Sequence, residues 1–135
     1  MTALDPKVER PELLSPLALA FVGDGVYELL ARQQLLARGS APVGRLHSRT
    51  VELVSAAAQA RAYRLVAPLL SPEEDAIYRR GRNANSTRSP RHTDPAVYRC
   101  ATGMEALFGW LYLTGRVARL EQLFGVILAG QEGTE

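Results

Sequence analysis

The sequence has a single cysteine and no long apolar run. The lone thiol, Cys100, cannot form an intramolecular disulfide, and one cysteine with two distant histidines excludes zinc motifs such as CxxC or HExxH. No apolar run approaches the ~18 residues that a membrane span needs. The acidic, proline-containing N-terminus lacks the apolar core of a signal peptide. These absences predict a globular protein of the reducing cytoplasm with no membrane segment.

Strand-like alternation of β-branched residues is also absent, whereas helix start and stop signals recur. Ser15 and Ser71 each precede a proline, as an N-cap precedes the first helical position, and Glu74 completes a capping box. Gly39 and Gly115 are suited to end helices. We therefore expect an all-α fold with helices over residues 16–38, 43–70 (two helices or one bent helix), 72–81, 95–113 and 117–128.

The length of 135 residues fits one domain. We expect residues 13–130 to form it, with residues 1–12 and 131–135 as flexible ends. There is no internal repeat.

Positive charge is concentrated in one segment. The net charge is only +2, yet residues 79–92 hold five arginines and no acid, so the rest of the chain is slightly negative. Such a distribution is typical of an anion-binding loop, the alternative being a solvated basic turn. The polar and basic residues of interest are Arg79, Arg80, Arg82, Asn83, Asn85, Arg88 and Arg91.

Two acids stand in unusually apolar helices. Asp24 lies in the stretch LALAFVGDGVYELLA, which is apolar all round and is expected to be buried, and Glu105 is the only charge between Arg99 and Arg116. A buried carboxylate is costly unless it is paired, hydrogen-bonded or bound to a metal. We therefore expect Asp24 and Glu105 to converge as an oxygen-rich site for Mg²⁺ or Mn²⁺, the alternative being that each pairs with a buried arginine.

Glycines flank both acids: Gly23 and Gly25 around Asp24, Gly103 and Gly109 around Glu105. Each costs a helix roughly 1 kcal/mol relative to alanine. Close packing of the two helices, or close approach of a ligand, would explain them.

Other polar and aromatic residues have ordinary explanations beside functional ones. Glu28 could be an outer ligand of a metal or could pair with Arg32 at the helix surface. His47 could contact RNA, but a lone helical histidine is more often structural or solvated. Four tyrosines could pack in the core or stack on nucleic-acid bases, and packing is the more common role: Tyr63, Tyr78, Tyr98 and Tyr112.

Three segments together resemble a known family. FVGDGVYELLA resembles the signature helix of ribonuclease III, and ATGMEALFGWLYL resembles its second acidic helix. With RGRN and a polar loop between them, the chain is similar to the small Mini-III ribonucleases over about residues 13–128. These are ribonuclease III catalytic domains without a double-stranded RNA-binding domain.

The resemblance implies a helical homodimer that hydrolyses double-stranded RNA with Mg²⁺, or with Mn²⁺ as a substitute, and that matures the large-subunit ribosomal RNA precursor in bacteria. Asp24 and Glu105 match the family's catalytic, metal-binding acids, and Phe21 matches the aromatic residue that inserts into a pocket of the partner subunit. The arginine-rich segment would then hold the duplex beside the site. The chain departs from full-length ribonuclease III at Ala20 and Thr102, where those enzymes have further acids.

Two other functions fit parts of the pattern. A non-catalytic ribonuclease III-like module could bind RNA or a ribonucleoprotein, but a decayed site would tend to lose Asp24 or Glu105. An all-α metal-dependent nucleotide pyrophosphohydrolase also gathers carboxylates on helices. Those enzymes need paired acids in an ExxE arrangement, and the isolated Asp24 and Glu105 argue against it.

Overall fold

The computed structural model describes residues 8–84 and 94–132, and these parts are helical, which confirms the all-α expectation. The stretch from 43 to 70 forms two helices and a 3₁₀ turn, and the last helix continues beyond residue 128. A short 3₁₀ helix near the N-terminus was not expected. In chain order the elements are η1 (Pro11–Leu13), α1 (Pro16–Ala37), α2 (Val43–Val54), α3 (Ala56–Val66), η2 (Ala67–Leu69), α4 (Pro72–Arg82), α5 (Pro95–Leu113) and α6 (Val117–Glu132).

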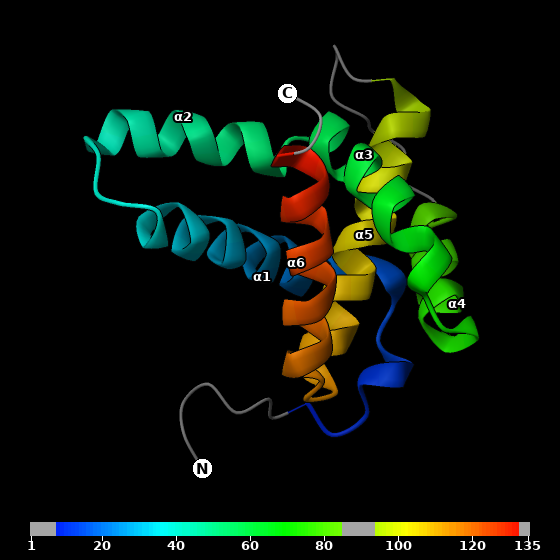
Figure 1. The fold of residues 1–135 in the computed structure, drawn as a ribbon. Helices are drawn as coiled ribbons and strands as arrows, with labels where there is room; N and C mark the ends of the chain where they lie inside the picture. Colours follow the sequence, from blue (N-terminus) through cyan, green and yellow to red (C-terminus); the bar gives the residue numbers. More distant parts are fainter. Residues whose placement is uncertain (1–7, 85–93, 133–135) are drawn as a thin grey trace.

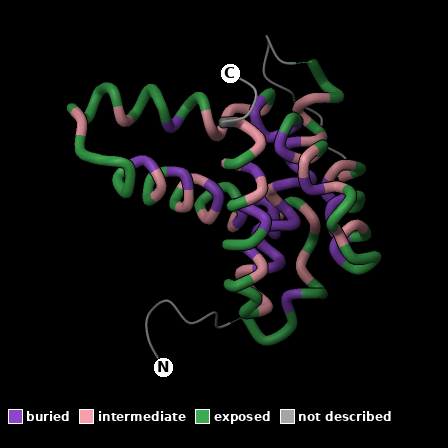
Figure 2. Tube along the Cα trace, viewed as in Figure 1, coloured by how far each residue is buried: buried purple, intermediate pink, exposed green. Residues whose placement is uncertain are grey.

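Helix α5 is the centre of the bundle. It packs against α1, α3, α4 and α6, and ten of its 19 residues are buried (Figures 1 and 2). Its fully buried Phe108 is in ring contact with Tyr27 of α1, which also meets Phe124 of α6 edge-on. Across the described residues, no helix is both long and apolar enough to cross a membrane.

Helix α1 is not buried all round, so that expectation was wrong. It buries the face that carries Leu19, Gly23 and Tyr27, while the opposite face leaves Phe21 82% and Leu29 56% exposed. The second half of α1 and the whole of α2 extend away from the bundle (Figure 1), and α2 buries only Thr50. The apolar exposed face of α1 therefore has no partner within the described chain.

The helix ends follow the sequence signals. The Ser15 hydroxyl accepts a hydrogen bond from the Ala18 amide, and the Ser71–Glu74 capping box is complete. Ser55 separates α2 from α3 because its extended backbone ends one helix while its hydroxyl caps the next. Gly115, at φ +77°, adopts the left-handed conformation that ends α5.

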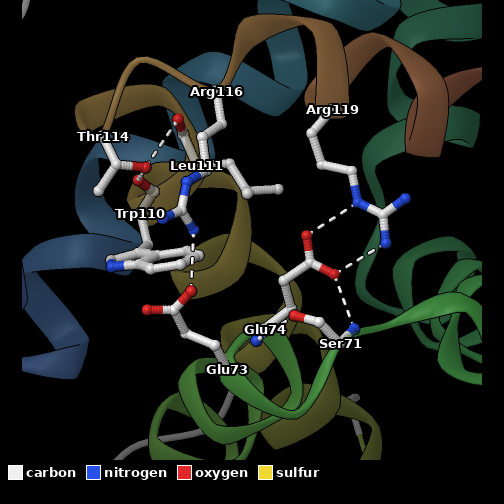
Figure 3. Close-up of polar contacts among 8 residues, drawn as sticks. All are labelled: Ser71, Glu73, Glu74, Trp110, Leu111, Thr114, Arg116 and Arg119. Atoms are coloured by element: carbon white, nitrogen blue, oxygen red, sulfur yellow. Dashed lines mark hydrogen bonds and ion pairs between the residues drawn. The ribbon is translucent and has the colours of Figure 1, made fainter.

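The capping glutamate also fastens α6 to the bundle. Glu74 is buried, and both of its carboxylate oxygens accept hydrogen bonds of 2.8 Å from Arg119 (Figure 3). Arg119 also donates to the Leu69 carbonyl. This arginine holds the pKa of Glu74 below its usual value, mainly through those hydrogen bonds. A second, exposed pair lies nearby, where Arg116 stacks on Trp110 and contacts Glu73.

We expect Glu74→Gln to lower the free energy of unfolding by about 1–3 kcal/mol at pH 7, because it weakens charge-assisted hydrogen bonds to a buried group. Since the pKa of Glu74 is depressed in the fold, this contribution is present above the unfolded pKa and disappears as pH falls through the folded pKa. Urea unfolding at several pH values measures it. The matched control is Glu73→Gln, which removes an exposed pair and should cost under about 1 kcal/mol. Equal losses in the two variants would contradict the assignment.

Candidate active site

The site begins with the contact between α1 and α5. A Cβ atom at Gly23 would overlap the Glu105 carbonyl oxygen, and one at Gly109 would overlap the Leu19 carbonyl oxygen. The two helix backbones therefore touch, which confirms the expected close packing for these two glycines. Gly103 instead makes room for the Tyr78 ring of α4. Gly25 has open space around it, so helix packing does not explain that glycine.

This contact brings the two acids together. Asp24 follows Gly23 directly, and Glu105 is the residue whose carbonyl Gly23 touches. The Asp24 carboxylate acts on Glu105 both as a nearby charge and as a hydrogen-bond partner. The two differ in exposure, since Asp24 is exposed and Glu105 is half-buried. The expectation that Asp24 is buried was wrong, because it lies at the edge of the face that α1 packs on α5.

The environment of Glu105 disfavours its charge. The pKa of Glu105 is raised to about 7, first by burial and then by the negative charge of Asp24, with a smaller opposing effect from the Gln59 amide. In the described part of the chain no arginine acts on Glu105, so the paired-arginine alternative does not hold for this residue. A pKa shifted by burial and by a specific charged neighbour is a common feature of functional sites.

Gln59 of α3 is a site residue that the sequence did not reveal. Its side chain is buried, and its amide nitrogen lies 3.0 Å from the Val54 carbonyl and 3.4 Å from a Glu105 carboxylate oxygen. The sequence AAAQARAY gives only a weak signal, because an uncharged polar residue among alanines on a helix is common. Tyr27 is a second neighbour, because the charge of Glu105 adds to burial in raising the pKa of the Tyr27 phenol.

The residues present suit a hard divalent cation. The two carboxylates supply oxygen donors, and within the described part of the chain no positively charged group is among the causes that shift the pKa of Glu105. Among the residues that the structure describes, two buried side-chain atoms have no hydrogen-bond partner, the Tyr27 hydroxyl and the Gln59 amide oxygen. No group of three or more acidic, histidine or cysteine ligands occurs within residues 8–84 and 94–132.

The two positions at which the chain departs from full-length ribonuclease III are buried in the structure. Ala20 and Thr102 are buried, and the Thr102 hydroxyl donates to the Tyr98 carbonyl one turn earlier in α5. Neither offers a free oxygen to the site.

The basic segment starts beside α5. A Cβ atom at Gly81 would lie 2.7 Å from the Ala106 side chain and 3.1 Å from the Thr102 carbonyl, so the C-terminal end of α4 rests on the α5 turn that carries Glu105. Arg80 and Asn83 are exposed there. Two of the other predicted RNA contacts already have partners within the chain. Arg79 pairs with Asp75 at 2.7 Å, and Arg82 lies over the Tyr78 ring and donates to Asn83. The last three, Asn85, Arg88 and Arg91, lie outside the described residues.

Glu28 pairs with Arg32 at 3.1 Å on the surface of α1, which was one of the two roles predicted for it. His47 is exposed on α2 and lines a shallow pocket with Arg32 and Leu36. Tyr63 and Tyr78 stack on each other with centroids 3.8 Å apart, so their role is packing between α3 and α4.

Comparison with known proteins agrees with this geometry. The Ribonuclease III domain model matches residues 17–116. The Mini-ribonuclease 3 of Thermoanaerobacter sp. is 48% identical over 110 residues, which cover 82% of this chain and 78% of the relative. That of Symbiobacterium thermophilum is 42% identical over 117 residues, covering 87% and 90%. A crystal structure of a Fusobacterium nucleatum protein superposes with a TM-score of 0.81 at 26% identity, over 92% of this chain and 99% of that chain.

The fold is an all-α bundle in which two acids meet at a helix contact. This fold, together with the similarities above, defines the class of protein. The chain belongs to the ribonuclease III family. Within that family it is an endoribonuclease of the Mini-ribonuclease 3 type.

The raised pKa of Glu105 gives a test of the site without metal. Because the folded pKa is about 7, against an ordinary 4.5, the folded protein is more stable when Glu105 is protonated. That stability is fully present below about pH 4.5 and is lost as pH rises through 7. In a chelator, Glu105→Gln should therefore gain about 3 kcal/mol relative to wild type between pH 4.5 and 8. Parallel stability curves from urea unfolding would show that the pKa of Glu105 is not raised in the folded protein.

Proposed function

We propose that this endoribonuclease is a homodimer that cuts double-stranded RNA with Mg²⁺, using Asp24 and Glu105, and that its substrate is the large-subunit ribosomal RNA precursor. The observation that carries the proposal is the meeting of these two carboxylates at the α1–α5 contact, with the pKa of Glu105 raised to about 7. The similarity to Mini-ribonuclease 3 enzymes supports the reaction class.

Asp24 and Glu105 would hold the metal. A bound Mg²⁺ activates water as a nucleophile and stabilises negative charge on the phosphate under attack. Asp24 is exposed and can face a duplex, whereas Glu105 is half-buried and fixed from behind by the bundle. Because Glu105 binds a cation only as a carboxylate, protons compete with the metal below about pH 7.

The C-terminal end of α4 would contact the RNA backbone. Duplex RNA is recognised mainly through phosphates and 2′-hydroxyls, which suit arginine and asparagine. Arg80 and Asn83 are exposed next to the α5 turn that carries Glu105. Arg79 is partly neutralised by Asp75, so we assign it a smaller share of the binding than Arg80.

The exposed apolar face of α1 supports the dimer. Phe21 is 82% exposed, and beside it α1, α5 and α6 line an open groove of about 420 Å³ that includes Val26, Leu29, Tyr112 and Leu120. Two copies related by a two-fold axis could each place Phe21 in the groove of the other, because an isologous interface uses the same surface twice. Two sites related in this way address both strands of a duplex.

The activity test uses charge removal at nearly constant volume. Asp24→Asn and Glu105→Gln should each lower cleavage of a labelled RNA duplex in Mg²⁺ by more than about a hundredfold, with unchanged helical circular dichroism, since even residues that only support metal ligands cost 10–100-fold. Glu73→Gln, an exposed acid of α4 in contact with Arg116, should cleave like wild type. Turnover near wild type in Asp24→Asn or Glu105→Gln would remove that residue from the reaction. A wild-type protein that cuts single strands but not duplexes would refute the substrate.

The dimer test uses Phe21→Ala. Burying a phenylalanine contributes about 2 kcal/mol per side chain, so the dimer dissociation constant should rise by about 30-fold or more, and cleavage should fall at low protein concentration. Leu36→Ala is the control, because Leu36 is 58% exposed but lies outside the residues of the groove. Analytical ultracentrifugation over a dilution series measures both. An unchanged dissociation constant for Phe21→Ala would contradict this interface.

A further inference from the structure

We propose that Gln59 is a positioning residue, whose amide holds the Glu105 carboxylate in the orientation that binds the metal. The inference deepens the proposed function, on which its catalytic consequence rests. Gln59 lies on α3, outside both acidic helices, and it is 2% exposed.

The hydrogen bonds fix which way the amide points. The Gln59 nitrogen lies between two acceptors, the Val54 carbonyl at 3.0 Å and a Glu105 carboxylate oxygen at 3.4 Å. An amide turned the other way would place its oxygen against both acceptors, which is unfavourable in a buried position. Gln59 therefore presents one N–H to the backbone and one to Glu105.

The bond to Val54 anchors the amide. Val54 is the last residue of α2, and Ser55 caps the start of α3 immediately after it. The Gln59 side chain is thus tied to the backbone at the α2–α3 junction before it reaches Glu105. An amide that already donates to a backbone carbonyl loses little further conformational entropy when it donates to a second acceptor. Gln59 is therefore suited to a positioning role.

Gln59 and Asp24 act on Glu105 in opposite ways. Asp24 is an acceptor like Glu105, so the two share a hydrogen bond only while one of them is protonated. Within residues 8–84 and 94–132, the side chain that donates a hydrogen bond to the Glu105 carboxylate is that of Gln59. It can keep this bond when Glu105 is ionised, which is the state that binds a cation. One carboxylate oxygen is then held by the amide, and the other is left for the metal.

The experiment compares two substitutions of similar size. Gln59→Met and Gln59→Leu each remove the amide donor and keep most of the bulk. Val66→Ala is the control for lost packing, because Val66 is fully buried on the same helix and makes none of these contacts. The measurements are Mn²⁺ affinity by calorimetry, single-turnover cleavage at saturating duplex RNA, duplex affinity in chelator, and thermal stability.

We expect both Gln59 variants to bind Mn²⁺ about tenfold or more weakly and to lose single-turnover rate by a similar factor, as other residues that orient metal ligands do. Duplex affinity in chelator should change less than about twofold, and Val66→Ala should lose stability but keep wild-type Mn²⁺ affinity. Wild-type Mn²⁺ affinity in Gln59→Met would overturn the proposal. So would an equal loss of affinity in Val66→Ala.

These outcomes separate the two proposals. A wild-type protein that binds Mn²⁺ but does not cut duplex RNA would refute the proposed function, and the Mn²⁺ affinities would still decide the role of Gln59. A wild-type protein that binds no Mn²⁺ would overturn both.

Discussion

The backbone contact between α1 and α5 is the constraint on which the site depends. At Gly23 and Gly109 each helix lies against a carbonyl oxygen of the other, with no room for a Cβ atom on either side. Only glycine permits this approach, and it costs each helix about 1 kcal/mol of intrinsic stability. In return, Asp24 and Glu105 lie close enough to share a proton, although they are far apart in the sequence. The other helices hold this contact in place rather than supply the acids.

The two acids differ in how deeply they are buried. Glu105 is surrounded by the bundle, with Gln59 and Tyr27 as neighbours, and is therefore held in one position. Asp24 lies at the border between the packed and exposed faces of α1. A site with one fixed and one accessible carboxylate is open to a large substrate on one side only. The same helix carries the exposed Phe21 and Leu29 on its outer face, so α1 connects the interior of the bundle, the acidic pair and the proposed partner surface.

Much of the fold and part of the site could be predicted, because helix ends and close helix contacts leave signals in the local sequence. The caps at Ser15 and Ser71 mark helix starts directly in the sequence. Two of the four glycines beside the acids, Gly23 and Gly109, lie at the close helix contact that was expected of them. The expected burial of Asp24 was wrong because an apolar helix was taken to be buried on every side, whereas one face of α1 is exposed in the described chain. Gln59 could not be predicted, since its role depends on how α3 packs on α5, and neither spacing nor composition encodes that.

The most direct test of this account changes the contact rather than the acids. Gly23→Ala adds one methyl group where the Glu105 carbonyl lies, and Gly44→Ala adds the same group to α2 in open space. Thermal unfolding and Mn²⁺ titration of both variants measure the fold and the site together. The account predicts that Gly44→Ala keeps wild-type stability and Mn²⁺ affinity, whereas Gly23→Ala loses Mn²⁺ binding, through separation of the two helices or through unfolding. A Gly23→Ala protein with wild-type melting temperature and wild-type Mn²⁺ affinity would contradict it.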